Sequence, residues 1–262
     1  MNRTMINAVN TLSQLQKKMD VTSNNVANVN TVGYKRSDAT FADLVHQQTV
    51  NMYRENEDIG RQTPYGIRLG TGAMMAQAQM VGTQGAFGQT GRTLDFALSK
   101  PNQFFKVLVQ NEEGTGRVHY TRDGSFSLTP SGGENVMLVT SEGYPVLDEL
   151  NNPIIMRPEE MTVRAGGLLG IIQVDKLQFL ERASNNLLVL PEDPAVEEGQ
   201  VLRNLTGAER EDAGIQNGML EQSNVDFSKE MSDLMVTQRS YQFQSKAISI
   251  ADQMLGLING VR

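Results

Sequence analysis

The sequence predicts an α+β protein in which an N-terminal and a C-terminal helix form a discontinuous helical coiled-coil domain that flanks an inserted antiparallel β domain. Apolar residues recur at heptad spacing near both ends of the chain. Between these ends, apolar and polar residues alternate in short runs separated by Gly and Pro turns. We therefore expect five segments: an N-terminal helix of the helical core at 1–33, a linker or extended arm at 34–75, the antiparallel β domain at 76–205, a return linker at 206–223 and the C-terminal helix of the helical core at 224–262.

The first segment is predicted to be a helix with one apolar face. Gly33 is expected to end the segment, because glycine readily adopts the left-handed backbone conformation that follows many helices. The spacing also fits an ordinary amphipathic helix packed on a core, so both interpretations stay open. The apolar face consists of two rows with a period of seven, Met5, Leu12, Met19 and Val26, and three residues later Ala8, Leu15, Thr22 and Val29.

The middle of the chain is predicted to be an antiparallel β domain without intervening helices. The dipeptide Asp123-Gly124 marks a tight turn between two of the expected strands. Residues 34–75 contribute few apolar side chains, so they read as an arm rather than as part of a core. Strands are expected at 104–109, 118–121, 126–129, 136–139, 154–156, 161–163, 171–174, 177–179 and 187–190.

The C-terminal helix is predicted to be apolar on two nearly opposite sides. A first row contains Phe227, Leu234, Tyr241, Ile248 and Leu255, and a second row contains Val236, Phe243, Ile250 and Leu257. A displacement of two residues at about 100° each rotates the second row by roughly 200° around the helix. Burial in a bundle would explain both rows, but the chain has only one other long helix, which covers one side. Contact with neighbouring subunits is the second explanation.

Composition excludes several classes of function. The formal net charge is −7 and the sequence pI is about 5.0, which disfavours nucleic-acid binding. The absence of cysteine excludes disulfides, thiol catalysis and Cys-ligated zinc. With only two histidines, a His-rich metal site is excluded too. An Asp/Glu metal site and a catalytic pair of carboxylates stay open on sequence alone, but no such group stands out, and we expect no catalytic residues, no cofactor and no metal. The pair Lys35-Arg36 is interpreted as solvated or as helix-end charge.

No targeting or membrane segment is expected. The opening residues 1–7 contain no apolar run of the kind found in secretory signal peptides. No stretch is long and apolar enough to suggest a membrane span, so we expect no membrane insertion. Export would then use a route without a cleaved signal peptide.

Segments along nearly the whole chain resemble the bacterial flagellar basal-body rod and hook-basal body protein family. Residues 23–35, SNNVANVNTVGYK, are similar to the N-terminal signature of that family, and residues 218–226, GMLEQSNVD, to its C-terminal signature. Further similar segments follow in order at 83–85, 94–98, 104–107, 120–126, 143–147 and 185–187. The pattern is most similar to distal rod members. Arg92 and residues 180–185 depart from the family pattern, so a hook-type or rod–hook junction protein stays open.

The resemblance implies a structural subunit, not an enzyme, that assembles through its terminal helices into a tubular axial filament. Such a filament transmits torque and forms part of the export channel. The implied partners are further copies of the chain, other rod and hook proteins and the flagellar export apparatus, in a basal body outside the cytoplasmic membrane. An alternative of another class is a soluble β-rich binding module with a helical dimerisation stalk. The residues expected at the self-assembly interface are Met5, Leu12, Met19, Asn24, Asn25, Asn28, Asn30, Gly33, Leu234, Tyr241, Phe243, Ile248, Ile250 and Leu255.

Overall fold

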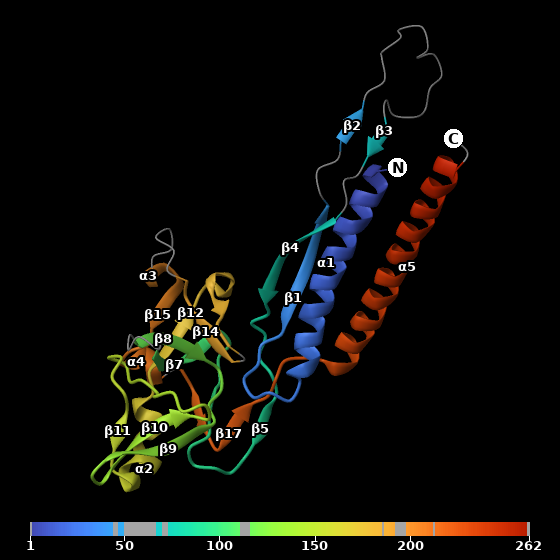
Figure 1. The fold of residues 1–262 in the computed structure, drawn as a ribbon. Helices are drawn as coiled ribbons and strands as arrows, with labels where there is room; N and C mark the ends of the chain where they lie inside the picture. The colour runs from blue at the N-terminus through green and yellow to red at the C-terminus, as the bar shows by residue number, and fades with distance from the viewer. Residues whose placement is uncertain are drawn as a thin grey trace. The chain divides into compact units, whose positions relative to one another are not determined.

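The computed structural model describes residues 2–43, 47–49, 67–69, 73–110, 116–184, 186–191, 198–211 and 213–260 (Figure 1). Most of the expected arm, 44–46, 50–66 and 70–72, lies outside the described residues. The chain divides into two compact units. The helical unit contains Met1–Asn24, Asp38–Ala78 and Ser228–Arg262, and the β unit contains Asn25–Ser37 and Gln79–Phe227.

Two long helices dominate the helical unit. Helix α1 spans Asn2–Ala27 and helix α5 spans Phe227–Gly260. Glu230 lies in the first turn of α5, where a negative charge stabilises the positive end of the helix dipole. Strand β1 (Ser37–Asp43) pairs with β4 (Ala73–Met80), and β2 (Gln47–Thr49) pairs antiparallel with β3 (Ile67–Leu69). The ammonium group of Lys18 on α1 lies 5.3 Å from the centre of the Phe41 ring on β1.

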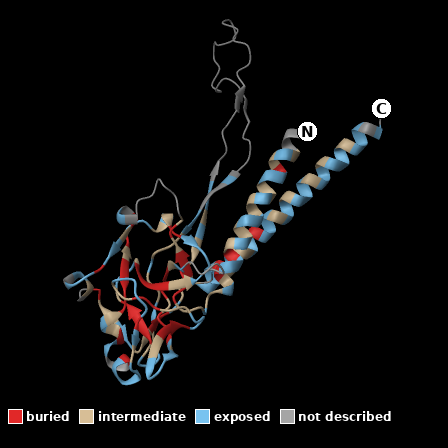
Figure 2. Cartoon of the chain, turned by 60° about the vertical axis from the view of Figure 1, so that its left-hand side comes forward, coloured by how far each residue is buried: buried red, intermediate tan, exposed pale blue. Residues whose placement is uncertain are grey.

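The apolar rows of the two helices differ in exposure. On α1, Ala8 and Thr22 are buried, and the other described members of the two heptad rows are half-buried. On α5, the first row is half-buried from Leu234 to Leu255, while every residue of the second row is exposed (Figure 2). The two-sided pattern of α5 therefore corresponds to one shielded side and one side in contact with solvent.

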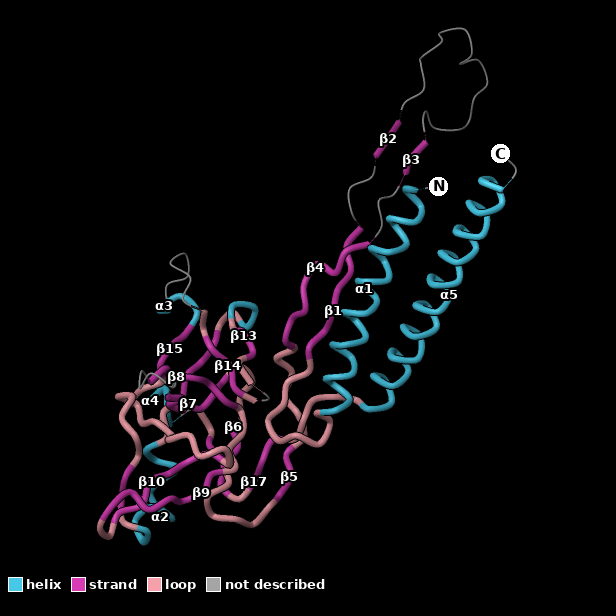
Figure 3. The backbone as a smooth tube through the Cα atoms, in the orientation of Figure 1, coloured by secondary structure: helices cyan, strands magenta, loops and turns pink. Residues whose placement is uncertain are grey.

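The β unit contains four described sheets (Figure 3). The largest has the order β13-β14-β8-β7-β12-β15 and its neighbouring strands are antiparallel. Phe105 at its centre pairs with Thr121 on one side and with Ile171 on the other. The strands of this sheet are β7 Gln103–Gln110, β8 Gly116–Thr121, β12 Ile171–Val174, β13 Glu181–Arg182, β14 Leu187–Val189 and β15 Leu202–Asn204.

Smaller sheets complete the β unit. Strand β10 (Asn135–Thr140) lies between β9 (Phe126–Gly132) and β11 (Ile155–Met156), and both pairings are antiparallel. Strand β6 (Phe96–Leu98) pairs with β16 (Ile215–Asn217), and β5 (Phe87–Gln89) pairs with β17 (Met219–Glu221). These last two pairs bring the segment that precedes α5 back to the start of the β unit. The short helix α3 (Glu198–Val201) precedes β15, and the short helix α4 (Ala208–Glu211) lies between β15 and β16.

Aromatic packing holds the core of the β unit together. The rings of Phe105 and Phe126 meet edge to face with centroids 5.3 Å apart, and Phe96 lies 6.2 Å from Phe126. Each such pair contributes about 0.5–1.5 kcal/mol beyond the burial of its area. Met161 and Ala165 reach the same core from helix α2 (Pro158–Leu168).

Two of the expected strands are wrong. Residues 161–163 lie in α2, and residues 177–179 form the 3₁₀ helix η2 (Leu177–Phe179). Pro158 begins α2, where its missing N–H is not needed, and the acidic Glu159 and Glu160 occupy the first turn. Met161 and Ala165 then share one face at the spacing of a helix turn. The segments Met-Thr-Val at 161–163 and Leu-Gln-Phe at 177–179 alternate like strands, but three residues are too few to distinguish this period from that of a helix.

Candidate functional site: the faces of α5 and the polar cluster joining the terminal segments

The Asn-rich segment after α1 is held by the side chain of Asn25, which is 1% exposed. Its amide nitrogen donates to the carbonyl oxygen of Ser37 at 2.8 Å, and its amide oxygen accepts from the Ser37 N–H at 3.0 Å. The hydroxyl of Tyr34 donates to the same oxygen at 3.2 Å. Asn25 thereby ties the end of α1 to the start of β1. Asparagine suits this place because its amide both donates and accepts.

Gly33 brings this segment against the turn after β8. Its φ of +69° lies in the left-handed region, as the sequence predicts. A Cβ at this position would lie 2.6 Å from the carbonyl carbon of Arg122 and 2.6 Å from the backbone nitrogen of Asp123. The Gly33 N–H donates to the carbonyl oxygen of Glu221 at 2.8 Å. Only glycine allows this approach of the N-terminal segment to β8 and β17.

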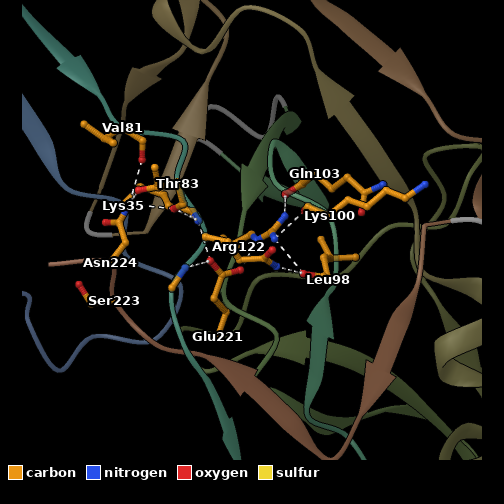
Figure 4. Close-up of polar contacts among 12 residues, drawn as sticks. Lys35, Val81, Thr83, Leu98, Lys100, Gln103, Arg122, Glu221, Ser223 and Asn224 are labelled. Atoms are coloured by element: carbon orange, nitrogen blue, oxygen red, sulfur yellow. Dashed lines mark hydrogen bonds and ion pairs between the residues drawn. The ribbon is translucent and has the colours of Figure 1, made fainter.

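Three buried charged side chains meet beside Gly33 (Figure 4). The ammonium of Lys35 donates to Oε1 of Glu221 at 2.6 Å, and Nε of Arg122 donates to Oε2 of the same carboxylate at 2.5 Å. The three side chains are between 1% and 3% exposed. The interpretation of Lys35 as a solvated charge is therefore wrong. We call Lys35, Arg122 and Glu221 the buried charge cluster.

The buried charge cluster contains two cations and only one carboxylate. Backbone carbonyl oxygens accept the remaining hydrogen bonds of the two cations. Lys35 also donates to the carbonyl of Thr83 at 2.9 Å. Arg122 donates to the carbonyls of Leu98 and Lys100, each at 2.8 Å, and to that of Gln103. Lys35 thus makes two hydrogen bonds and Arg122 makes four, which offsets much of the cost of burying their charges.

Burial and charge pairing shift the pKa values of the cluster in opposite directions. Burial lowers the pKa of Lys35 and of Arg122, although the Glu221 carboxylate acts against that shift. Burial also raises the pKa of Glu221, but the charges of Arg122 and Lys35 outweigh it and hold the pKa of that carboxyl below its usual range. Glu221 is therefore ionised at neutral pH, and its negative charge offsets the desolvation cost of the two buried cations.

Asn224 joins the two terminal segments a second time. Its amide oxygen accepts from the N–H of Arg36 at 2.7 Å. Its amide nitrogen donates to the carbonyl of Val81 at 3.0 Å and to that of Thr83 at 2.9 Å. The chain leaving α1 and the chain entering α5 are thus fixed to the same strand-like segment at 81–83 (Figure 4).

The predicted interface residues differ in exposure, and Phe243 and Ile250 are among the exposed ones. Asn25 and Gly33 are buried and hold the polar contacts described above, while Asn24 and Asn30 are exposed, and Asn28 accepts from the Thr31 hydroxyl at 3.1 Å. Met5, Leu12, Met19, Leu234, Tyr241, Ile248 and Leu255 are half-buried on the two helices. Sequence reasoning missed Lys35, Arg122, Glu221 and Asn224 as a group, because they are distant in sequence. Each lies in one of the family-like segments 23–35, 120–126 and 218–226, but nothing in the sequence relates these segments to one another.

The second row of α5 is the largest exposed apolar feature of the helices. Val236 is 60% exposed, Phe243 71%, Ile250 56% and Leu257 71%. Among the described residues, ten of the fifteen exposed large apolar side chains lie on α1 or α5. Four exposed apolar side chains thus repeat along one side of α5.

Acidic and histidine side chains of the described residues form no metal-binding group. No group of three or more His, Asp or Glu side chains among these residues is placed to hold a metal ion. No described helix has the length and apolar character that a membrane span requires. Asp123 stabilises its own turn, because its Oδ1 accepts from the backbone N–H of Ser125 at 2.9 Å and from the Ser125 hydroxyl at 2.7 Å.

Comparison with known proteins matches three parts of the chain to flagellar family models. Residues 5–35 match "Flagella basal body rod protein", residues 101–171 match "Flagellar hook protein FlgE/F/G D1 domain" and residues 216–261 match "Flagellar basal body rod FlgEFG protein C-terminal". The first and last of these matches contain Lys35 and Glu221, and the middle match contains Arg122.

Whole proteins match over nearly their full length. The chain is 42% identical to the flagellar hook-basal body complex protein FlhP of Bacillus subtilis, with 100% of both chains covered. It is 33% identical to the flagellar basal-body rod protein FlgG of Buchnera aphidicola subsp. Schizaphis graminum, covering 93% of this chain and 94% of that protein. FlgG of Borreliella burgdorferi is 31% identical, with 100% of this chain and 99% of that protein covered. The chain therefore belongs to the flagellar basal-body rod and hook-basal body protein family.

Proposed function

We infer that this chain is a structural subunit of the bacterial flagellar basal-body rod, and we propose that it assembles through its two terminal helices. The observation that carries the assembly proposal is the second row of α5, whose four apolar side chains are all more than half exposed. Exposed apolar residues along one stripe of a helix favour packing against a further helix. Contacts of this kind that join unlike surfaces and do not close generate a helical filament.

The division of the chain into a helical unit and a β unit supports a different role for each unit. We propose that α1 and α5 form the coiled-coil wall of a tube and that the β unit forms an outer layer. The division of the chain at 1–33, 34–75, 76–205, 206–223 and 224–262 is part of this proposal. The partners are further copies of the chain, neighbouring rod and hook proteins and the flagellar export apparatus. The tube then transmits torque and encloses part of the export channel.

The position within the flagellum follows from the same proposal. The relatives named FlgG support a place in the basal-body rod, and we propose the distal rod outside the cytoplasmic membrane. We propose that the flagellar export apparatus carries the chain to this place. The proposed role needs no catalytic residue, cofactor or metal.

Phe243→Asp is expected to abolish assembly while leaving the subunit folded. Because Phe243 is 71% exposed, the change in the free energy of unfolding should stay within about 0.5 kcal/mol. Assembly is measured by swimming of cells that carry only the variant and by recovery of the chain in purified basal bodies. Gln242→Asp is the matched control, since it places the same charge at the neighbouring exposed position outside both apolar rows. Equal loss from both variants would contradict the proposal.

Leu234→Asp is expected to impair assembly as well, because the first row is the shielded side of the same helix.

Deleting residues 1–24 and 228–262 is expected to leave a cooperatively folding β unit that no longer enters basal bodies. The cut preserves Asn25 and Asn224, which hold the two chain ends of that unit. Denaturant unfolding followed by fluorescence or circular dichroism tests the fold, and incorporation of the truncated chain into basal bodies would refute the role of the helices.

A further inference from the structure

The start of α1 carries a second exposed apolar patch, which the sequence did not single out. Ile6 is 58% exposed and Val9 is 54% exposed, and both lie outside the two heptad rows of α1. The residues that continue the same face of α1 are polar, namely Ser13, Gln16 and Asp20, and all three are exposed. The patch is therefore confined to the first turns of α1. We call Ile6 and Val9 the N-terminal patch.

The N-terminal patch and the middle of the second row of α5 lie at similar distances along their helix axes from the end where α1 ends and α5 begins. Figure 1 shows that α1 ends and α5 begins at the same lower end of the helical unit, so the two helices run in opposite directions and their positions can be compared from that end. At about 1.5 Å per residue, Ile6 and Val9 lie about 27–32 Å from the end of α1 at Ala27. By the same measure, Phe243 and Ile250 lie about 24–35 Å from the start of α5 at Phe227.

We propose that the second row of α5 is covered, in the assembled state, by the N-terminal patch of a second copy of this chain. This inference rests on the proposed function. Copies that point the same way in a tube bring α1 of one copy beside α5 of the next as antiparallel helices. The two exposed apolar surfaces then face each other at the same height. A copy shifted along the axis by about two turns, or about 11 Å, brings the patch opposite Leu257 instead of Ile250.

The contact joins two different surfaces of the chain. One copy uses its second row and keeps a free N-terminal patch, while the neighbouring copy uses its N-terminal patch and keeps a free second row. Such a heterologous contact extends an assembly without closing it into a dimer. The polar continuation of the patch at Ser13 and Gln16 limits the contact to the first turns of α1. Val236, at the other end of the second row, is therefore left for a different neighbour.

Disulfide trapping tests the inference, and the chain suits the method because it contains no cysteine. One copy carries Ile6→Cys and one epitope tag, and a second copy carries a single cysteine at Phe243, Ile250 or Leu257 and another tag. The two are expressed together in motile cells that lack the unmodified chain. A disulfide forms only where Cα atoms come within about 4.4–6.8 Å. A product with both tags must join different copies, since each chain has one cysteine.

We expect a doubly tagged dimer with at least one second-row position, and which position reacts reports the axial shift between copies. Gln242→Cys and Ser249→Cys are the matched controls, because both are exposed on the polar side of α5 between the two rows. They should yield no dimer with Ile6→Cys. Val9→Cys repeats the measurement one turn further along α1, which keeps the test decisive if Ile6→Cys prevents assembly.

Motile cells in which no second-row cysteine reacts with either position of the patch, or in which the controls react equally, overturn this inference. They show that another segment or another protein covers the second row, while the proposed function stands. If the unmodified chain itself is absent from purified basal bodies, the proposed function fails and this inference fails with it.

Discussion

Replacing Glu221 by glutamine is expected to lower the free energy of unfolding of the β unit by about 3–5 kcal/mol, the range found when one partner of a buried ion pair is removed. Glutamine keeps the size of the side chain but removes the charge that Lys35 and Arg122 share at 2.6 Å and 2.5 Å. The variant then holds two buried cations with no anion between them. Denaturant unfolding of the full chain at neutral pH measures the effect.

Glu209→Gln is the matched control for this variant. Glu209 pairs with Arg203 at 4.0 Å, and both side chains are 55% exposed. An exposed pair of this kind contributes about 0–1 kcal/mol, so its loss should be small. Similar decreases in the free energy of unfolding for Glu221→Gln and Glu209→Gln would contradict the prediction, because the buried carboxylate would then stabilise the fold no more than the exposed one.

The contribution of Glu221 also depends on pH with a definite sign. The pKa of this carboxyl is lower in the folded chain than in the unfolded one, so the unfolded state binds its proton first as pH falls. The stabilisation is complete above the unfolded value of about 4.3 and disappears as pH falls through the lower folded value. The difference in stability between the parent chain and Glu221→Gln should therefore be constant near neutral pH and shrink in acid. A difference that grows in acid would contradict this assignment.

Gly33→Ala is expected to have the second-largest effect on stability. Alanine must adopt a φ of +69°, which costs about 1–2 kcal/mol. Its Cβ would also lie 2.6 Å from backbone atoms of Arg122 and Asp123, so the N-terminal segment must move away from them. Overpacking of this kind costs about 1–3 kcal/mol more. The displacement also lengthens the hydrogen bond from Gly33 to the carbonyl of Glu221.

Gly91→Ala distinguishes the cost of placing alanine at a positive φ from the cost of the close Cβ contact at position 33. Gly91 has a φ of +71°, close to that of Gly33, but no atom lies within 4 Å of its added Cβ. It should therefore show the backbone effect alone. The free energy of unfolding of both variants is measured in denaturant, and equal losses would mean that the close approach of Gly33 to β8 is unimportant. Combining Gly33→Ala with Glu221→Gln should give less than the sum of the two effects, because the two residues are in contact.

The order of elements and the family were predictable from the sequence, because both depend on local patterns. Heptad spacing is visible within one helix, and it distinguishes the first row of α5 from the second row. The flagellar signatures are also contiguous runs, at 23–35 and 218–226. Short apolar runs gave less reliable predictions. Residues 161–163 fit a strand and a helix equally well, and burial of Met161 in the β core decided for the helix.

By itself, the sequence determined the helical ends, the β-rich middle, the need for glycine at 33 and the family, since each follows from neighbouring residues. Only the tertiary structure decided that Lys35, Arg122 and Glu221 share one buried site, because 186 residues separate Lys35 from Glu221 and no local pattern relates them. The same holds for exposure. A period of seven places Phe243 and Ile250 on one side of α5, but only the packed chain shows that no described part of it covers that side. Burial is a property of the whole fold, and for these residues it determined which charge is structural and which apolar surface is available for assembly.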